Sequence, residues 1–229
     1  MRKPLLYLIL SLLSLANFAG EQFIVKDGKP NAQIVIAAEN RPRMVTLAAL
    51  ELQYHLHKMS GVRLPIATSP DASVPVKIYV GRSLETEKLG INTDDLKYGS
   101  YRIKSGADWL VLVGDDRDFD SPFKPLPKTR GENEKGIEAW KKATAGKTDS
   151  EWMFPFGGAY KNYWNPKDFD KIFDDRYGEG SSALWKTGGN TSSGFWNFDE
   201  NGSLNAVCDF LRSLGCRWYM PGQENEVIP

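Results

Sequence analysis

The sequence predicts an α/β (α+β) fold in which a mixed β-sheet packs against two main helices, with a long aromatic-rich insertion before the last helix. Two segments repeat apolar residues at three- and four-residue steps, as amphipathic helices do. Several shorter segments alternate apolar and polar residues or flank turn residues, as strands do. Residues 115–202 lack such periodicity but hold five of the seven tryptophans. A chain of 229 residues is long enough to bury these segments in one large domain.

The first 20 residues have the layout of a secretory signal peptide. Arg2 and Lys3 precede an apolar run, Leu5–Leu15, and small residues follow it. The run is too short to cross a bilayer, which takes about 20 apolar residues. We therefore expect residues 1–20 to be cleaved and the mature domain, 21–229, to be secreted or periplasmic without a membrane partner.

The charges of the chain are balanced. There are 29 basic and 29 acidic residues and no long run of one sign. Nucleic acids and anionic membranes bind proteins through basic patches, so we expect neither of them as a partner.

Two short strands and a long helix follow the leader. The apolar stretches Phe23–Val25 and Gln33–Ala37 surround the turn residues Asp27–Pro30, which predicts a hairpin or two adjacent strands. The helix is expected to begin near Pro42 and to end before Gly61. Its apolar stripe, which needs a sheet or another helix to cover it, consists of Val45, Ala48, Ala49, Leu52, Leu56 and Met59.

The middle of the chain predicts one more strand, a short helix and a hairpin. Residues 76–80 alternate as a strand does and end at a glycine, and a helical piece covers 84–89. Residues 100–104 and 109–114 flank the turn sequence 105–108, which is a strong hairpin signal.

The last helix is expected to be capped by Ser203 and to end at Gly215. Its apolar positions are Leu204, Val207, Leu211 and Leu214. Cys208 lies inside this helix and Cys216 just beyond it, about two turns apart, which is farther than the ~7 Å between Cα atoms that a disulfide tolerates. We expect two buried free thiols.

The insertion, residues 115–202, is too long for an ordinary loop and too rich in aromatic residues for a disordered one. We expect most of it to be ordered, with a looser part between Lys124 and Ser150. Two roles stay open for its aromatic side chains: a small core of their own, or stacking on sugar rings. The candidate carbohydrate-binding residues are Trp152, Tyr160, Tyr163, Trp164, Trp185 and Trp196.

The residues themselves identify no catalytic group, metal site or cofactor site. Glu51 and His55 share a helical face, but His55 and His57 lie about 200° apart around the axis, so they are expected to be ordinary surface residues. The acidic loop Asp115, Asp116, Asp118 and Asp120 lacks the glycine and glutamate of a calcium loop, so solvated turn residues are expected there. No pair among the many other acids has a spacing typical of a glycosidase.

Four segments together resemble the N-terminal domain that precedes the catalytic barrel in secreted α-glucuronidases and β-N-acetylhexosaminidases, and in related secreted proteins of unassigned activity. They are the helical segment AALELQYHLHKMSGVRLPI from Ala48 to Ile66, the strand KIYVG from Lys77 to Gly81, the hairpin from Tyr101 to LVLVG at Gly114, and GSLNAVCDFLRSLGCRWYMPG from Gly202 to Gly222.

The resemblance implies a non-catalytic accessory domain of a glycoside hydrolase-like protein of carbohydrate metabolism. A (β/α)8 barrel of the same gene product would follow residue 229 as its partner, with Arg217, Trp218 and Tyr219 at or near the interface, although a plain core role is equally open for Trp218. A free-standing carbohydrate-binding module that uses the insertion aromatics, with polysaccharide as partner, is the alternative. A self-contained hydrolase is a third hypothesis.

Overall fold

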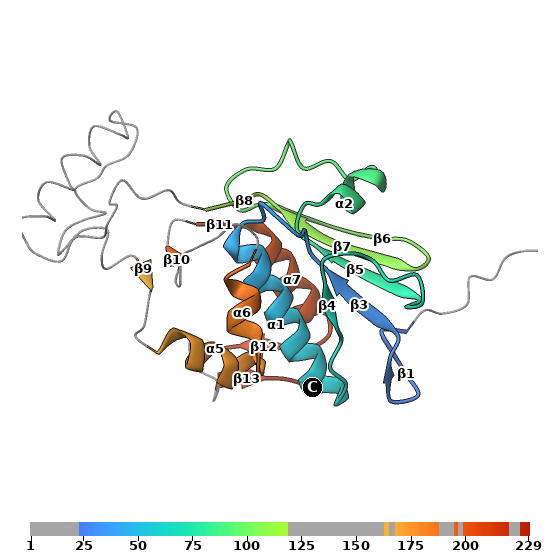
Figure 1. Ribbon diagram of the computed structural model, residues 1–229. Helices are drawn as coiled ribbons and strands as arrows, with labels where there is room; N and C mark the ends of the chain where they lie inside the picture. Colours follow the sequence, from blue (N-terminus) through green and yellow to red (C-terminus); the bar gives the residue numbers. More distant parts are fainter. Residues whose placement is uncertain (1–22, 119–162, 165–167, 188–194, 197–198, 220–224) are drawn as a thin grey trace, which may run out of the picture.

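The computed structural model describes residues 23–118, 163–164, 168–187, 195–196, 199–219 and 225–229. The expected fold class is confirmed: a five-stranded mixed sheet packs against helices (Figure 1). The strand order is β4-β3-β5-β7-β6, in which β6 is antiparallel to β7 and the other neighbours are parallel. The strands are β3 (Ala32–Val35), β4 (Ile66–Ala67), β5 (Val76–Val80), β6 (Tyr101–Ser105) and β7 (Trp109–Gly114).

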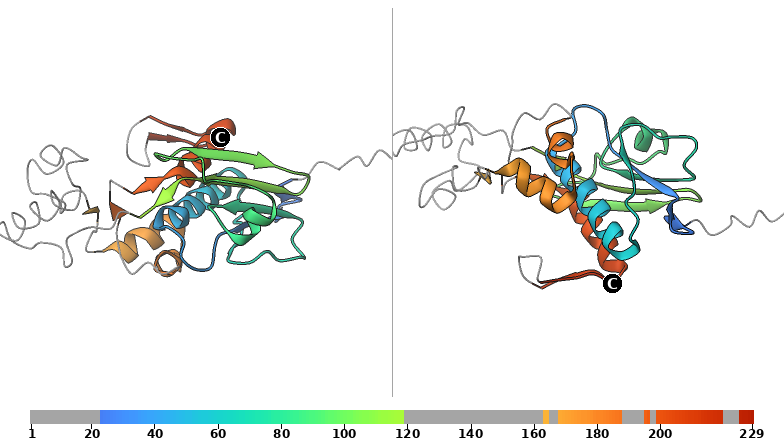
Figure 2. Two further views of the ribbon diagram at one scale, coloured as in Figure 1. Left: turned by 90° about the horizontal axis from the view of Figure 1, so that it is seen from above. Right: turned by 60° about the horizontal axis from the view of Figure 1, so that its bottom comes forward.

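Helices α1, α5, α6 and α7 lie in two layers on one face of this sheet. Helices α1 and α7 run side by side against the sheet, and α5 and α6 pack on the outer side of α1 (Figures 1 and 2). The segment that follows α2 covers part of the opposite face. The helices are α1 (Arg43–Ser60), α2 (Leu84–Lys88), α5 (Phe169–Tyr177), α6 (Ser181–Trp185) and α7 (Gly202–Ser213).

Alternation along the strands supplies both faces of the sheet with apolar side chains, because successive residues point to opposite sides. The face toward α1 and α7 is lined by Ile34, Ile78, Val80 and Leu112. The opposite face is lined by Val35, Tyr79, Val111 and Val113.

The predicted long helix is confirmed at both ends. Helix α1 starts after Pro42 and ends at Gly61, whose positive φ of 71° closes the helix with a hydrogen bond from its N–H to the His57 carbonyl. The sheet and α7 cover one side of α1, whereas α5 and α6 cover another side. Polar residues of α1 are therefore buried as well as its apolar stripe. One of them, Gln53, donates a hydrogen bond of 2.6 Å to the Leu64 carbonyl.

The expected cap of the last helix is wrong. Helix α7 begins at Gly202, and the Ser203 side chain caps nothing in its own helix. Instead Asp116 accepts hydrogen bonds from the Ser203 N–H, at 2.8 Å, and from the Ser203 hydroxyl, so a carboxylate 87 positions earlier caps the helix. The start of α7 also meets the end of β7 so closely that a Cβ on Gly202 would lie 2.6 Å from the Ser100 carbonyl oxygen.

Short two-stranded ribbons complete the fold. They pair β1 (Val25–Lys26) with β2 (Lys29–Pro30), β8 (Asp116–Arg117) with β11 (Glu200–Asn201), β9 (Tyr163–Trp164) with β10 (Phe195–Trp196), and β12 (Arg217–Trp218) with β13 (Glu226–Val227). The first ribbon is a hairpin across Asp27 and Gly28, and the strand predicted after it, now β3, joins the central sheet instead.

The β8–β11 ribbon brings the two ends of the insertion together, with Asp116 opposite Asn201. The insertion therefore leaves the α/β core and returns to it at one place, which lets a long segment be added without disturbing the sheet. The leader, residues 1–20, and the part between Lys124 and Ser150 that was expected to be looser both lie outside the described residues.

Candidate functional site

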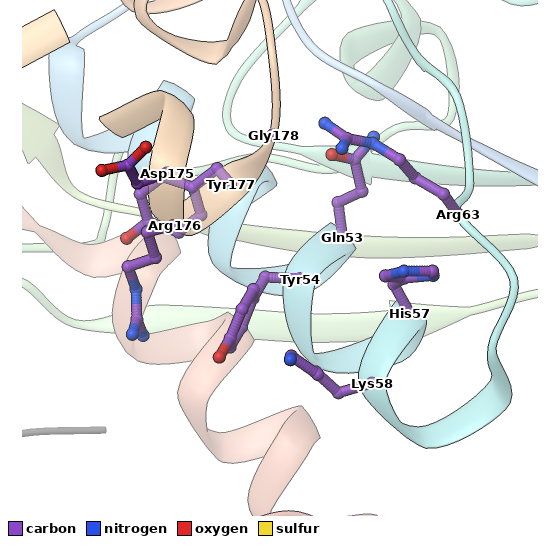
Figure 3. Close-up of a pocket in the computed structure, with 9 residues that line it drawn as sticks. All are labelled: Gln53, Tyr54, His57, Lys58, Arg63, Asp175, Arg176, Tyr177 and Gly178. Carbon is purple, nitrogen blue, oxygen red and sulfur yellow. The ribbon is translucent and has the colours of Figure 1, made fainter. Parts of the chain in front are cut away.

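A pocket of about 260 Å³ opens where the C-terminal half of α1 faces the end of α5. Helix α1 contributes four side chains from two neighbouring turns, and the segment after α1 contributes Arg63 (Figure 3). The other wall comes from the last turn of α5 and the glycine that ends it. The lining residues are Gln53, Tyr54, His57, Lys58, Arg63, Asp175, Arg176, Tyr177 and Gly178.

A buried polar network forms the wall behind this pocket. Glu51 accepts hydrogen bonds from the Tyr177 hydroxyl and, at 3.2 Å, from the Arg176 guanidinium. Arg176 also donates to Glu226 of β13 at 2.9 Å and lies 4.7 Å from the centre of the Tyr54 ring. The network therefore joins α1, α5 and the C-terminal ribbon in one set of contacts.

The pKa values in the network follow from burial and pairing. Burial by itself raises the pKa of Glu51, but the hydrogen bonds from His55 and Tyr177 and the charge of Arg176 outweigh burial and hold that pKa below its usual value. Burial and the negative charge of Glu51 raise the pKa of the Tyr177 hydroxyl well above its usual value. Glu51 is thus ionised and Tyr177 is a hydrogen-bond donor at neutral pH.

The pocket carries positive charge that the described residues do not neutralise. Arg176 is paired with Glu51 and Glu226, and Asp175 is paired with Lys171. Within the described part of the chain, Lys58 and Arg63 form no ion pair with an acidic side chain. Both side chains are exposed and border the pocket, so their charges are available to a ligand.

His55 is not the surface residue that the sequence suggested. Its side chain is 0% exposed, because α1 is covered on several sides. The Nδ1 atom lies 2.9 Å from the Glu51 carbonyl oxygen and 3.3 Å from a Glu51 carboxylate oxygen, so it carries the proton that these acceptors require. The ring makes an edge contact with Trp218, at 5.2 Å between centres. His57, in contrast, is exposed and borders the pocket.

The three residues predicted to face a neighbouring module lie on the C-terminal ribbon. Tyr219 is 73% exposed, whereas Trp218 is half-buried on His55. Arg217 is exposed but folds back to donate hydrogen bonds to the carbonyls of Arg212, at 2.8 Å, and Cys216. Tyr219, Val227 (49% exposed) and Leu214 (41%), on this ribbon and at the end of α7, are exposed apolar side chains, here together called the ribbon face.

Of the candidate sugar-binding aromatics, only Trp185 has a side chain whose surroundings the structure describes. Trp185 is 0% exposed and packs against Phe169 and Phe173, so its sugar-binding role is a wrong prediction and the alternative of an internal aromatic core applies to it. Trp164 and Trp196 lie on β9 and β10, where the register sets Trp196 opposite Tyr163. The remaining two candidates, Trp152 and Tyr160, lie outside the described residues.

Two acidic residues after β7, Asp116 and Asp118, are not simple solvated turn residues, and Asp120 lies outside the described residues. Asp116 caps α7, and Asp118 accepts a hydrogen bond of 2.9 Å from the Arg43 N–H at the start of α1. Two carboxylates of one short segment therefore serve two helix N-termini, where negative charge is favourable. Burial raises the pKa of Asp116 to about 6, although its hydrogen bonds from Ser203 oppose that rise. Burial also raises the pKa of Asp118, against the influence of Arg43.

Sequence reasoning missed the buried pair between Arg43 and Asp199. Arg43 Nε lies 2.7 Å from one Asp199 carboxylate oxygen and Nη2 lies 2.8 Å from the other, so the contact is bidentate. It ties the first turn of α1 to the returning end of the insertion. The two residues are 156 positions apart and neither belongs to a recognisable motif, so no sequence signal could have paired them.

Both cysteines are free, as expected from their spacing. Burial raises the pKa of the Cys208 thiol to about 11 and also raises that of Cys216, so neither is poised as a nucleophile. Cys216 is buried and Cys208 only half-buried. In the described ranges no three His, Cys, Asp or Glu side chains come close enough to hold a metal ion. Likewise, none of the helices described here has the length and apolar character needed to cross a membrane.

Comparison of the chain with protein-family models and with characterised proteins finds no match. The functional interpretation therefore depends on the geometry above and on the four resembling segments.

Proposed function

We propose that this chain is a non-catalytic accessory domain of a secreted carbohydrate-active protein, in which it supports a downstream (β/α)8 barrel. The domain supplies a preformed α/β framework and a docking surface, and the barrel supplies the chemistry. The ribbon face is the part of the framework that we assign to the barrel.

The observation that carries this proposal is that the four resembling segments assemble into one framework. They form α1, β5, the β6–β7 hairpin and α7, and these elements enclose the main apolar core. Gly114 of the hairpin and Gly202 of α7 meet backbone to backbone, so that a Cβ on either glycine would collide with neighbouring backbone atoms. Segments that are separate motifs in the sequence are thus in direct contact in the fold, as expected if together they form the framework of an accessory domain.

The side chains that were candidates for a catalytic role give the proposal a second support. Glu51 is engaged by Tyr177 and Arg176, and Asp116 is engaged by Ser203. The raised pKa of the Cys208 thiol makes it a poor nucleophile. These side chains stabilise the framework, which fits a supporting domain better than a self-contained hydrolase.

The ribbon face is suited to docking because its apolar side chains stand on a fixed base. Below Tyr219 and Val227, the same ribbon holds Trp218 against His55 and Glu226 against Arg176. A rigid base lowers the entropic cost of binding, since little has to be ordered when a partner arrives.

The test uses the product of the complete reading frame with a protease site introduced after Pro229. After cleavage, we expect the two modules to elute together in gel filtration and to separate in the variant Tyr219→Asp. The matched control is Tyr98→Asp, which changes a tyrosine that is 87% exposed on another side of the domain. Elution of the wild-type modules as separate species, or a reading frame that ends at Pro229, would contradict the proposal.

The register of β9 and β10 favours a second candidate, a carbohydrate-binding module. It sets Trp196 opposite Tyr163 and Phe195 opposite Trp164, which concentrates four aromatic residues on one short ribbon. Exposed aromatic rings stack on the C–H faces of sugars. Retention of the isolated chain on immobilised polysaccharide, with loss of retention in Trp164→Ala and Trp196→Ala, would favour this candidate, whereas free passage of the wild type through a panel of polysaccharides would exclude it.

A further inference from the structure

We propose that the pocket between α1 and α5 binds the acidic group, a carboxylate or a sulfate ester, of an acidic sugar. The geometry points to an anion because Lys58 and Arg63 reach the rim from the α1 side while Arg176 and Tyr177 form the opposite wall (Figure 3). This inference concerns a site other than the ribbon face. That the ligand is a sugar rests on the proposed function, whereas the preference of the pocket for an anion rests on the charges of the pocket alone.

The charge of the lining favours an anion. Arg176 is neutralised by Glu51 and Glu226, so the positive charges left for a ligand are those of Lys58 and Arg63, and Asp175 is the one acidic residue among the described lining side chains. Asp175 is occupied by Lys171, outside the pocket. Arg63 and Lys58 lack an acidic partner in the described part of the chain, so an anion would replace solvent and not a protein carboxylate.

Arg63 places its guanidinium at the border of the pocket, beside the end of α5. It crosses from the α1 side to the end of α5, and its Nη1 lies so close to Gly178 that a Cβ there would collide with it. A guanidinium offers parallel N–H donors that match the oxygens of a carboxylate or sulfate. Lys58 lies over the Tyr54 ring, with Nζ 5.4 Å from the ring centre, and supplies a second donor at the border of the pocket, on the other side from the Arg63 guanidinium (Figure 3).

The size of the pocket selects a small ligand. Its volume of about 260 Å³ lies just below the roughly 300–1,000 Å³ of drug-sized sites, so one sugar residue fits and a folded oligosaccharide does not. The pocket is open to solvent and its wall also offers the Tyr54 and Tyr177 rings and the Gln53 amide. These groups can contact the hydroxyl groups and the C–H surface of an acidic sugar.

The test is a titration of the isotopically labelled chain 21–229, followed by the amide shifts in NMR spectra. The probes are sodium D-glucuronate, glucose 6-sulfate, glucose and sodium acetate. We expect saturable shifts at residues 53–63 and 175–178 with at least one of the two acidic sugars, weaker binding of acetate, and no saturable shift with glucose. Lys58→Gln and Arg63→Gln are each expected to weaken binding of the acidic sugar about tenfold.

The matched control is Lys104→Gln, which removes an exposed positive charge on β6 and should leave the affinity unchanged. Unchanged melting curves of the three variants show that each is folded. The proposal is overturned if neither acidic sugar binds, if glucose or acetate binds as tightly as the acidic sugars, or if the pocket variants bind as the wild type does. Because this assay uses the isolated chain, its result is separate from the docking test, and either proposal can fail without the other.

Discussion

The contact between Gly202 and the end of β7 gives the sharpest stability prediction. A Cβ at position 202 would lie 2.6 Å from the Ser100 carbonyl oxygen and 2.8 Å from the Asp115 carbonyl oxygen, both of which are backbone atoms that cannot rotate away. The start of α7 would have to move in Gly202→Ala. Hydrogen bonds hold this contact, among them Asp115 N–H to the Ser100 carbonyl, Gly202 N–H to the Asp115 carbonyl, and Ser203 N–H to the Asp116 carboxylate.

The cost follows from those contacts. Each hydrogen bond contributes about 1 kcal/mol, and overpacking a close contact costs about 1–3 kcal/mol, so we expect Gly202→Ala to lower the free energy of unfolding by about 3 kcal/mol. The control is Gly90→Ala, where a Cβ meets nothing within 4 Å and the positive φ of 70° alone costs about 1 kcal/mol.

Urea denaturation followed by tryptophan fluorescence measures both variants, and a thermal melt provides a check. A loss of about 3 kcal/mol corresponds to a decrease of roughly 6–12 °C in Tm for a domain of this size. If Gly202→Ala is no less stable than Gly90→Ala, the contact between the β6–β7 hairpin and the start of α7 is not close enough to exclude a Cβ, and the prediction is wrong.

Three further predictions concern buried groups. Glu51→Gln should cost about 3 kcal/mol at neutral pH because it removes one of the two carboxylates paired with Arg176, while Glu85→Gln on the exposed α2 should cost under about 0.5 kcal/mol. The pKa of Glu51 is lowered in the folded state from its usual value of 4.5. The stability difference between wild type and Glu51→Gln should therefore be complete above pH 4.5 and should decrease as the pH falls below it. Equal differences at acidic and neutral pH in urea titrations would contradict this expectation. Trp185→Ala should cost about 3–5 kcal/mol by emptying the aromatic core of α5 and α6, whereas a variant as stable as wild type in the same titration would mean that Trp185 is not a core residue. The Cys208 thiol, with a pKa of about 11, should react with iodoacetamide at pH 8 about 100-fold more slowly in the native chain than in urea, and equal rates by mass spectrometry would show that it is not protected.

The elements that depend on local pattern could be predicted from the sequence. Helix α1 has a continuous apolar stripe between Pro42 and Gly61, and the structure places its ends at these residues. The β6–β7 hairpin was predicted equally well, because its turn residues and alternating strands are neighbours in the chain.

The features that depend on distant contacts could not be predicted in this way. His55 looked exposed because its own helix gives no sign that Trp218, far later in the chain, packs against its ring. Asp116 resembled a solvated turn residue because its partner, Ser203, follows 87 positions later. Trp185 resembled a sugar-binding residue because an aromatic side chain in an insertion has the same sequence signature whether it is buried or exposed.

The pocket between α1 and α5 could not be predicted from the sequence either, although one residue that lines it and one residue of the network behind it were noted. His57 and the acidic network residue Glu51 were considered only as metal ligands on one helix. The pocket arises when Arg63, which follows α1, meets Gly178 at the end of α5. A close approach of this kind between residues 115 positions apart follows from the packing of the helices and not from a local motif.

The central claim, that the ribbon face meets a downstream module, is tested most directly by hydrogen exchange. Amide exchange at Arg217–Tyr219 and Glu226–Ile228 would be measured in the isolated chain 21–229 and in the product of the complete reading frame. The account predicts exchange at least about tenfold slower in the longer protein at these residues, with unchanged rates at the exposed α2, since a docked partner excludes solvent from the ribbon. Equal exchange of the ribbon in the two proteins would contradict the claim.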